Sequence, residues 1–161
     1  MTGPAASSVV VALGDGDDVR LRIERIFSLA PFVRDLGITF IDAGPGWCET
    51  SIDIAPRHLQ HGGVVHAGVI GTLADHTAGG AAQTHCGPGE MVVTAEFKLN
   101  LLRPGRGGAL QCRAQVLKAG RSLHVVEAEV FGNRDGQRTL VAKFNGTMAV
   151  VPMGQPGSSP R

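Results

Sequence analysis

The sequence lacks long apolar runs and a strong charge of either sign. Its longest apolar stretches, such as residues 9–13 and 148–151, are far shorter than the roughly 20 residues that cross a bilayer. The net charge is +1 and 18% of the residues are charged, which gives no broad basic surface for nucleic acid. The first residues contain no basic segment followed by an apolar core, as a secretory signal would. We therefore expect a cytoplasmic protein that binds neither nucleic acid nor membrane.

Cysteine is scarce as well, and its three residues show no CxxC spacing. An odd number without paired spacing suits neither a disulfide framework nor a structural zinc site. We expect Cys48, Cys86 and Cys112 to be buried as small apolar side chains in a protein from a reducing compartment.

The length of 161 residues fits one domain with a substantial core. Residues 1–16 are rich in Gly, Ala and Ser, and the sequence ends with GQPGSSPR, so both ends are expected to be mobile. The predicted domain is residues 17–152, with residues 153–161 as a tail.

The chain begins its regular pattern with a helix and then turns to strands. Asp17 or Asp18 can cap a first helix, whose apolar face would be Val19, Ile23, Ile26 and Phe27. After Pro31, residues 36–44 and 47–55 flank a GPG turn and predict a hairpin.

A long helix over residues 66–82 separates this hairpin from four further strands, predicted at 93–101, 109–118, 122–132 and 138–151. The strand 93–101 shows strict alternation, with Phe97 on its apolar face and Thr94 on the opposite face. The order of helix, two strands, long helix and four strands predicts an α+β fold with a mostly antiparallel sheet.

The long helix has two contrasting faces. Its sheet-facing side is predicted to be Val69, Ile70, Leu73, Thr77 and Ala81. The opposite side is made of small residues around one carboxylate: Gly68, Gly71, Thr72, Asp75, Ala78, Gly79 and Ala82. Glycine is unfavourable inside a helix by roughly 1 kcal/mol relative to alanine, so we interpret these glycines as clearance for a partner helix or a substrate.

The position of Asp75 among small apolar neighbours calls for an explanation. A buried carboxylate is destabilising unless it has hydrogen-bond or ion-pair partners or a catalytic role. The free N–H groups at the helix start, near His66, Ala67 and Gly68, could hold a polarised carbonyl oxygen. Ala67 and Asp75 are eight residues apart, which is about 12 Å along the axis. One helix therefore cannot place both on one carbonyl, whereas two antiparallel copies could, which predicts a symmetric dimer with shared sites.

The segments LQHGGVVHAGVIGTLAD and VVTAEFKLNLLRPG together resemble the hot-dog-fold acyl-CoA thioesterases of the phenylacetate-degradation and 4-hydroxybenzoyl-CoA type. The family pattern is an Asn or Gln, then His-Gly-Gly six residues later, then an acidic residue near the middle of the helix. The resemblance spans roughly residues 34–150. It implies an antiparallel sheet wrapped around one long helix, with two such units paired edge to edge. We therefore expect a homodimer, with a dimer of dimers (a homotetramer) as the larger assembly.

The resemblance also implies residue roles. Asp75 would be the catalytic base or nucleophile, Gln60 would orient the thioester or water, and the N–H of Ala67 would bind the oxyanion. This chain has His66-Ala67-Gly68 in place of His-Gly-Gly, and the added methyl narrows the approach to the donor. The exact His-Gly-Gly sequence occurs at His61-Gly62-Gly63, but only His66 has the sequence spacing from Asp75 that the family pattern requires.

We expect substrate contacts from Thr72 and Gly79 on the small-residue face and from Asn100 on the following strand. Arg103 and Arg121, with Arg106 as a further candidate, could bind the phosphates of CoA because they fall at strand ends or turns.

Other chemistries fit less well. His58, His61 and His66 lack acidic or cysteine ligands beside them, so no metal site is expected. The glycines lack a following Lys-Ser/Thr, which excludes a P-loop, and Ser122 and His124 have no evident acidic partner for a triad.

The sequence thus predicts a hydrolase that splits an acyl-CoA thioester without any metal or redox cofactor, CoA being part of the substrate. A non-catalytic acyl-CoA-binding module and a hot-dog hydratase are the alternatives. The acyl group remains open.

Overall fold

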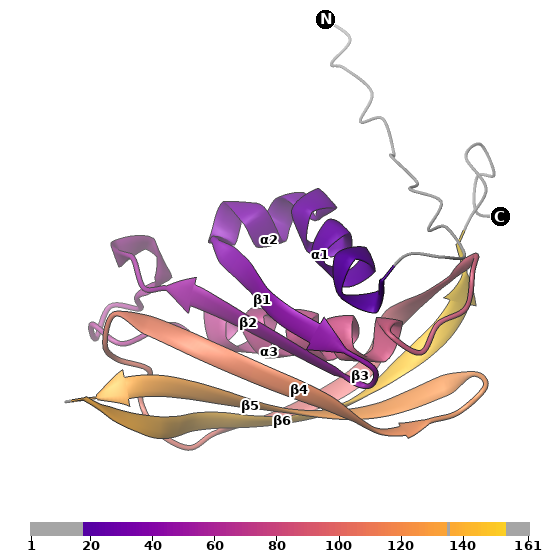
Figure 1. Cartoon of the computed structure of the whole chain (residues 1–161). Coiled ribbons are helices and arrows are strands. Elements are labelled where there is room, and N and C mark those ends of the chain that lie inside the picture. Colours follow the sequence, from indigo (N-terminus) through magenta and orange to yellow (C-terminus); the bar gives the residue numbers. More distant parts are fainter. Residues whose placement is uncertain (1–17, 135, 154–161) are drawn as a thin grey trace, which may run out of the picture.

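A curved antiparallel sheet wraps one central helix, α3 (Ala67–Gln83), in the computed structural model (Figure 1). The structure describes residues 18–134 and 136–153, and within them the sheet has six strands. The strands are β1 (Ile38–Gly44), β2 (Trp47–Asp53), β3 (Glu90–Leu101), β4 (Ala109–Ala119), β5 (Leu123–Arg134) and β6 (Gln137–Pro152). Their spatial order is β1-β2-β4-β5-β6-β3, and every neighbouring pair is antiparallel. The predicted α+β fold is confirmed, and so is the order of the hairpin, the long helix and the four later strands.

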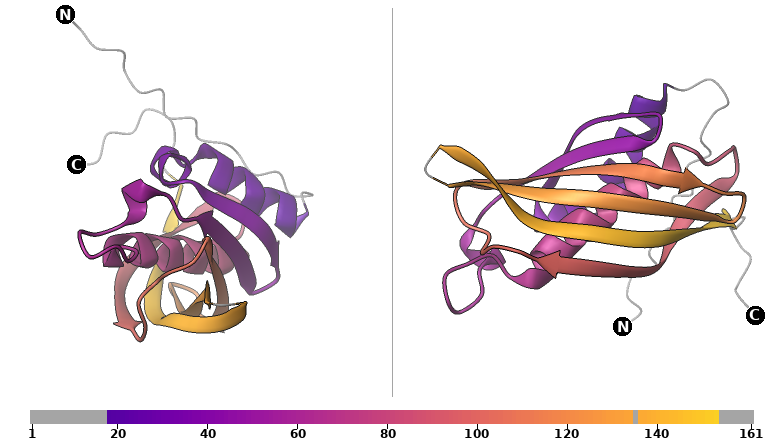
Figure 2. Two further views of the ribbon diagram at one scale, coloured as in Figure 1. Left: turned by 90° about the vertical axis from the view of Figure 1, so that its left-hand side faces the viewer. Right: turned by 90° about the horizontal axis from the view of Figure 1, so that it is seen from below.

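Two helices precede the sheet where one was predicted. Helix α1 (Val19–Leu29) begins as expected, because the Asp18 side chain accepts a hydrogen bond from the N–H of Arg20. Helix α2 (Pro31–Leu36) was not predicted. Pro31 occupies its first turn, where proline is tolerated, and Gly37 ends it in the left-handed conformation at φ 86°. Both helices lie on the side of α3 away from β5 and β6 (Figure 2).

Helix α3 buries the predicted face against the sheet. The residues of this face, Val69, Ile70, Leu73, Thr77 and Ala81, are all buried. Elsewhere in the chain the three cysteines are also buried, as expected. The small-residue face divides into two parts. Ala78 and Ala82 belong to the core, whereas a Cβ atom added at Gly79 would meet no atom within 4 Å. The interpretation of clearance therefore fits Gly79 but not these two alanines.

Strand β3 forms one edge of the sheet and contains a bulge. Its register with β6 shifts between Thr94 and Glu96, which inserts Ala95 as an extra residue. The predicted strict alternation is wrong here, because an extra residue reverses which side chains face the helix. Thr94 contacts Asp75 on α3, and Phe97 stacks on the buried Phe144 with ring centroids 5.0 Å apart. Thr94 and Phe97 consequently face the same side.

No helix in the described part of the chain is long and apolar enough to cross a membrane. The expected mobile segments, residues 1–16 and most of 153–161, lie outside the described residues, so those boundaries stay predictions.

Candidate active site

The short loop before α3 is fixed in place by hydrogen bonds of His58 and His66. His58 is buried. Its Nδ1 accepts from the N–H of Ala55 at 3.0 Å, so its Nε2 carries the proton and lies 2.9 Å from the carbonyl oxygen of Leu36. The His66 N–H donates to the His58 carbonyl at 2.8 Å. The loop that carries Gln60 is therefore anchored to the end of α2.

The loop tip itself is a tight turn. Leu59 and Val65 form a bridge, the N–H of Gln60 donates to Val64, and Gly63 takes φ 71°, which favours glycine. His61 and its two following glycines are exposed at this tip, away from α3.

The start of α3 presents one free backbone donor. His66 caps the helix, and its Nδ1 accepts from the N–H of Gly68 at 2.9 Å. Among the hydrogen bonds of the described residues, the Ala67 N–H donates to no acceptor. Of the three predicted members of the oxyanion site, Ala67 is thus the available donor, Gly68 is occupied, and His66 positions the turn.

A cavity of about 400 Å³ opens in front of this donor. One wall is the loop, with Gln60, His66 and Ala67, and the other is the segment after β3, with Leu101, Leu102 and Arg103. The two walls are joined by a hydrogen bond from the Val65 N–H to the Gly105 carbonyl at 3.0 Å. Gln60 and the free donor of Ala67 therefore border one cavity, and their predicted catalytic roles stay predictions.

Asp75 lies midway along α3 and is half-buried. Thr94 donates its hydroxyl hydrogen to Asp75 Oδ1 at 2.8 Å. Burial raises the pKa of Asp75, and the hydrogen bond from Thr94 lowers it in part. The neighbouring His76 gives no opposing cation, because burial lowers its pKa to about 4. The carboxylate is therefore a stronger base than an exposed aspartate.

The two halves of the site are not together within one chain. Asp75 contacts the first half of β3 at Thr94, whereas the cavity lies at the other end of β3, where Leu101 is among its lining residues. Asp75 is not among the residues that line this cavity. The separation expected from the helix rise is thus retained in the fold.

The other predicted residues are distributed unevenly. Thr72 donates to the Gly68 carbonyl at 2.9 Å, and Arg103 donates to the Leu140 carbonyl at 3.1 Å while lining the cavity. Asn100 pairs in register with Lys143 and does not line the cavity. Arg121 lies in the turn between β4 and β5. The next strand residue, Leu123, pairs with Ala149 of β6, which pairs in turn with Val93 of β3 and not with Leu101.

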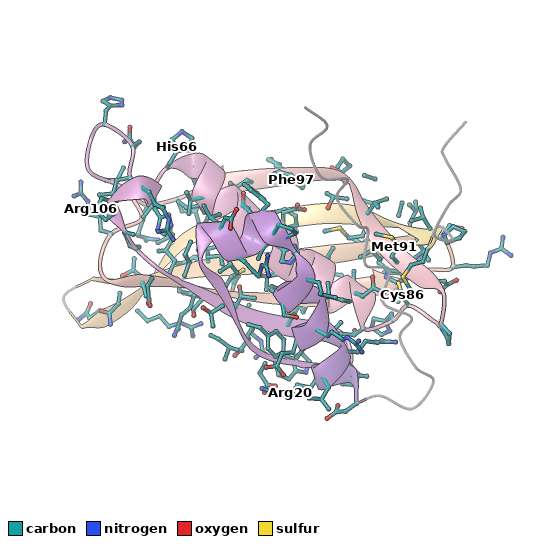
Figure 3. The ribbon with its side chains drawn as sticks, turned by 90° about the horizontal axis from the view of Figure 1, so that it is seen from above. Arg20, His66, Cys86, Met91, Phe97 and Arg106 are labelled. Carbon is teal, nitrogen blue, oxygen red and sulfur yellow. The ribbon has the colours of Figure 1, made fainter. Side chains whose placement is uncertain are left out.

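A second cavity of about 240 Å³ adjoins the first, with Arg103 and Pro104 in both linings. Arg106 and Thr139 line it as well, and Figure 3 shows Arg106 at the same end of the molecule as His66. Arg106, the weakest of the three arginine candidates in the sequence, therefore lies beside the site. Within the described residues, His, Cys, Asp and Glu side chains form no group of three or more that could hold a metal ion.

This chain is similar in sequence to several known proteins. The sequence model of the thioesterase superfamily matches residues 62–139. A Haemophilus influenzae protein that carries a provisional esterase name is 34% identical over 120 residues, which is 74% of this chain and 84% of that protein. The chain belongs to the thioesterase superfamily. A 1,4-dihydroxy-2-naphthoyl-CoA hydrolase of Listeria monocytogenes is 26% identical over 59% of this chain and 77% of that enzyme.

Solved structures confirm the hot-dog fold of this superfamily member. A thioesterase family protein from Silicibacter pomeroyi superposes with a TM-score of 0.79 at 30% identity, covering 81% of this chain and 96% of that one. The Escherichia coli PaaI protein, from the phenylacetic acid degradation operon, gives 0.71 at 24% identity over 79% and 88%. A Bacillus halodurans protein solved with CoA gives 0.61 at 28% identity over 64% and 66%.

Sequence reasoning missed the contacts of two residues around this candidate site. Thr94 was placed on the wrong face, because nothing in the sequence marks the bulge that turns it toward Asp75. His58 was considered only as a metal ligand, because its polar sequence neighbours Arg57, Gln60 and His61 do not mark it as a buried anchor.

Proposed function

We propose that this protein hydrolyses acyl-CoA thioesters at sites shared between two copies of the chain. The observation that carries the proposal is the half-buried Asp75 carboxylate, held by Thr94 on a helix face that is otherwise made of small residues. A carboxylate with a raised pKa suits general-base or nucleophilic chemistry near neutral pH.

In this mechanism Asp75 takes a proton from a water molecule as the water oxygen attacks the thioester carbonyl carbon. The negative charge that develops on the carbonyl oxygen is bound by the Ala67 N–H, at the positive end of the α3 dipole. Gln60 orients the thioester or water from the cavity wall. The tetrahedral intermediate then breaks its C–S bond, and CoA leaves as a thiolate that recovers a proton from Asp75 or solvent. Direct attack by Asp75 on the carbonyl carbon is the other route that this geometry supports.

The shared site follows from the separation of Asp75 and Ala67. The two are about 12 Å apart along one helix, so they cannot flank one carbonyl. Strand β3 lies at the edge of the sheet, and pairing with a second β3 in antiparallel fashion would bring Thr94 of one chain toward Leu101 of the other. Asp75 of one copy would then adjoin the cavity of its partner, in a homodimer.

CoA recognition is assigned to the arginines around the two cavities. Arg103 and Arg106 can bind phosphate from the same chain as Ala67, since both line the adjoining cavities. Arg121 lies at the far end of its own sheet, so in this proposal it reaches the site only from the partner chain. The CoA-bound relative and the naphthoyl-CoA hydrolase support CoA esters as the substrate class.

The test is release of free thiol from a panel of aromatic, medium-chain and long-chain acyl-CoAs. Asp75→Asn should keep the fold and bind acyl-CoA, but lose kcat by on the order of 10² or more because the base or nucleophile is gone. Asp53→Asn, a change at an exposed carboxylate on β2, is the matched control and should retain activity.

Hydrolysis by Asp75→Asn at the wild-type rate would remove Asp75 from the chemistry. Binding of acyl-CoA without thiol release by the wild type would favour the non-catalytic binding module. Conversion of an enoyl-CoA to its hydroxyacyl-CoA without thiol release would favour the hydratase.

A further inference from the structure

Strand β3 is closed at its beginning by a single side chain. Gln83, the last residue of α3, is only 5% exposed. Its Nε2 donates to the Glu90 carbonyl at 3.0 Å, and its Oε1 accepts from the Val92 N–H at 3.0 Å. One residue of a parallel neighbouring strand would make the same pair of bonds to two residues of β3. The open edge of β3 therefore begins after Val92.

The rest of this edge is long and carries exposed apolar side chains. In the described part of the chain, no strand pairs with β3 on the side away from β6. Val93, Phe97 and Leu101 are 42%, 46% and 51% exposed. Figure 3 shows Met91 near Cys86, where α3 ends, and Phe97 further along the open part of β3. An uncovered edge of this length is a template for pairing with another strand.

We propose that Gln83 is a positioning residue, which sets the register in which β3 pairs with β3 of a second copy. The proposal rests on the shared site described above. The stretch that Gln83 leaves open, Val93–Leu101, has its midpoint at Phe97. The regular ladder after the bulge, from Glu96 to Leu101, has its midpoint between Lys98 and Leu99. The two-fold axis therefore falls between Phe97 and Leu99.

This register completes the site. With the axis in that interval, Thr94 lies opposite residues 100–104 of the partner chain, which include the cavity-lining Leu101, Leu102 and Arg103. If the whole strand from Glu90 were open, its midpoint would lie between Ala95 and Glu96. Thr94 would then lie opposite the partner's Phe97, four residues and about 13 Å from the cavity-lining Leu101.

The register can be read by disulfide formation at single introduced cysteines. Glu96, Lys98 and Asn100 lie on the face of β3 away from α3, and the three native cysteines are buried, so the wild type is the blank. Cysteines whose Cα atoms are more than about 7 Å apart do not bridge. Under mild oxidation the Lys98→Cys variant should form a disulfide between two chains, either by itself or when mixed with the Glu96→Cys or Asn100→Cys variant. The Glu96→Cys variant by itself should form none.

Replacing Gln83 should change this pattern. Gln83→Met keeps the length of the side chain and removes both hydrogen bonds, so the edge opens toward Glu90. We expect Glu96→Cys alone to bridge in the Gln83→Met background, and thioester hydrolysis to fall at least tenfold while the protein stays dimeric. If circular dichroism shows that Gln83→Met is unfolded, Gln83→Glu takes its place, because it keeps the acceptor for Val92 and loses the donor to Glu90.

Bridging of Glu96→Cys with Gln83 intact, or an unchanged pattern in the folded Gln83 variant, would overturn the inference. The cysteine pattern needs no hydrolysis. The expected pattern in a protein without thioesterase activity would support the register and reject the proposed function. A chain that bridges at none of the three positions would overturn both this register and the shared site.

Discussion

Asp75 owes its chemical character to two neighbours of opposite effect. Burial among small residues of α3 disfavours the ionised form, while the Thr94 hydroxyl stabilises it. In the proposed mechanism Asp75 must be ionised to accept a proton, so activity should be lost on the acid side as pH falls through the pKa of Asp75. Because that pKa is raised above its ordinary value of 3.8, the loss should begin at a higher pH than for an exposed aspartate.

Thr94→Val should move this acid limb further toward neutral pH, because it removes the hydrogen bond that favours the carboxylate. A fall in kcat is expected as well, since Asp75 loses the contact that orients it. The measurement is the pH profile of kcat/KM, with Thr94→Ser as the matched variant that restores the hydroxyl and the wild-type profile. A Thr94→Val profile that overlays the wild type would separate Thr94 from the function of Asp75.

The same linkage affects stability. A raised pKa in the folded state means that the folded protein loses stability as pH rises from the unfolded value through the folded one. Asp75→Asn removes this cost, so at neutral pH it should unfold at an equal or higher urea concentration than the wild type. The difference should shrink as pH falls toward 4. Greater stability of the wild type at neutral pH would contradict the burial argument.

The arginines separate into two groups by their place on the sheet. Arg106→Ala should raise KM for CoA esters about tenfold or more, because a charge-assisted contact to phosphate contributes roughly 1.5–3 kcal/mol. Arg121→Ala should act in the same direction only if the partner chain supplies it. Thioesters that lack the nucleotide are the control substrates, and their KM should stay the same. An equal rise for both substrate kinds would place the effect outside phosphate recognition.

The two faces of helix α3 differ in the space that they leave beside two neighbouring glycines, Gly79 and Gly80. A side chain at Gly79 would meet no atom within 4 Å of its Cβ. A Cβ at Gly80 would lie 2.9 Å from the Cys48 sulfur and 3.0 Å from the Phe27 ring. Gly80 thus permits close packing of α1 and β2 on the helix, and Gly79 leaves room for something outside the chain.

Alanine at the two positions is therefore a matched comparison. Both changes gain helix propensity, by roughly 1 kcal/mol. Gly79→Ala should keep that gain in urea unfolding but lower activity if the open face receives substrate or partner. Gly80→Ala should be destabilised overall by its clash with the core. Equal stability of the two variants would mean that the helix faces are not divided in this way.

The whole molecule is expected to act as a pair, because in the proposed mechanism each chain supplies half of two sites. Ala67→Pro is a suitable lesion at the helix start. It deletes the free N–H at the first helical position, where proline is tolerated, and His66 before it is already extended at φ −62° and ψ 139°. Asp75→Asn removes the other half, and each variant alone should be nearly inactive.

Mixed in equal amounts and allowed to exchange subunits, the two variants should recover roughly a quarter of wild-type activity. Half of the dimers would be mixed, and each mixed dimer would have one intact site and one doubly altered site. Circular dichroism of Ala67→Pro is the control for folding. Proven subunit exchange without recovered activity would mean that the sites are not shared.

Local patterns in the sequence were sufficient for the order of the elements and for the helix that carries Asp75. Apolar periodicity and turn residues placed the hairpin, the long helix and four strands, because each depends on neighbours within a few residues. The sheet-facing side of α3 followed for the same reason. Gln60 was assigned through the family resemblance, and Ala67 through the free N–H groups at the helix start together with that resemblance. Both residues line one cavity, and their roles stay predictions.

What only the tertiary structure decided concerns contacts between elements far apart in the chain. The bulge in β3 reverses which side chains face α3, and so gives Asp75 its partner Thr94, 19 residues away. The anchor role of His58 depends on the carbonyl of Leu36, 22 residues earlier. Sheet order brought Arg106 to the site and left Arg121 at the other end. Register, bulges and sheet order arise from pairing between strands, which no local period encodes.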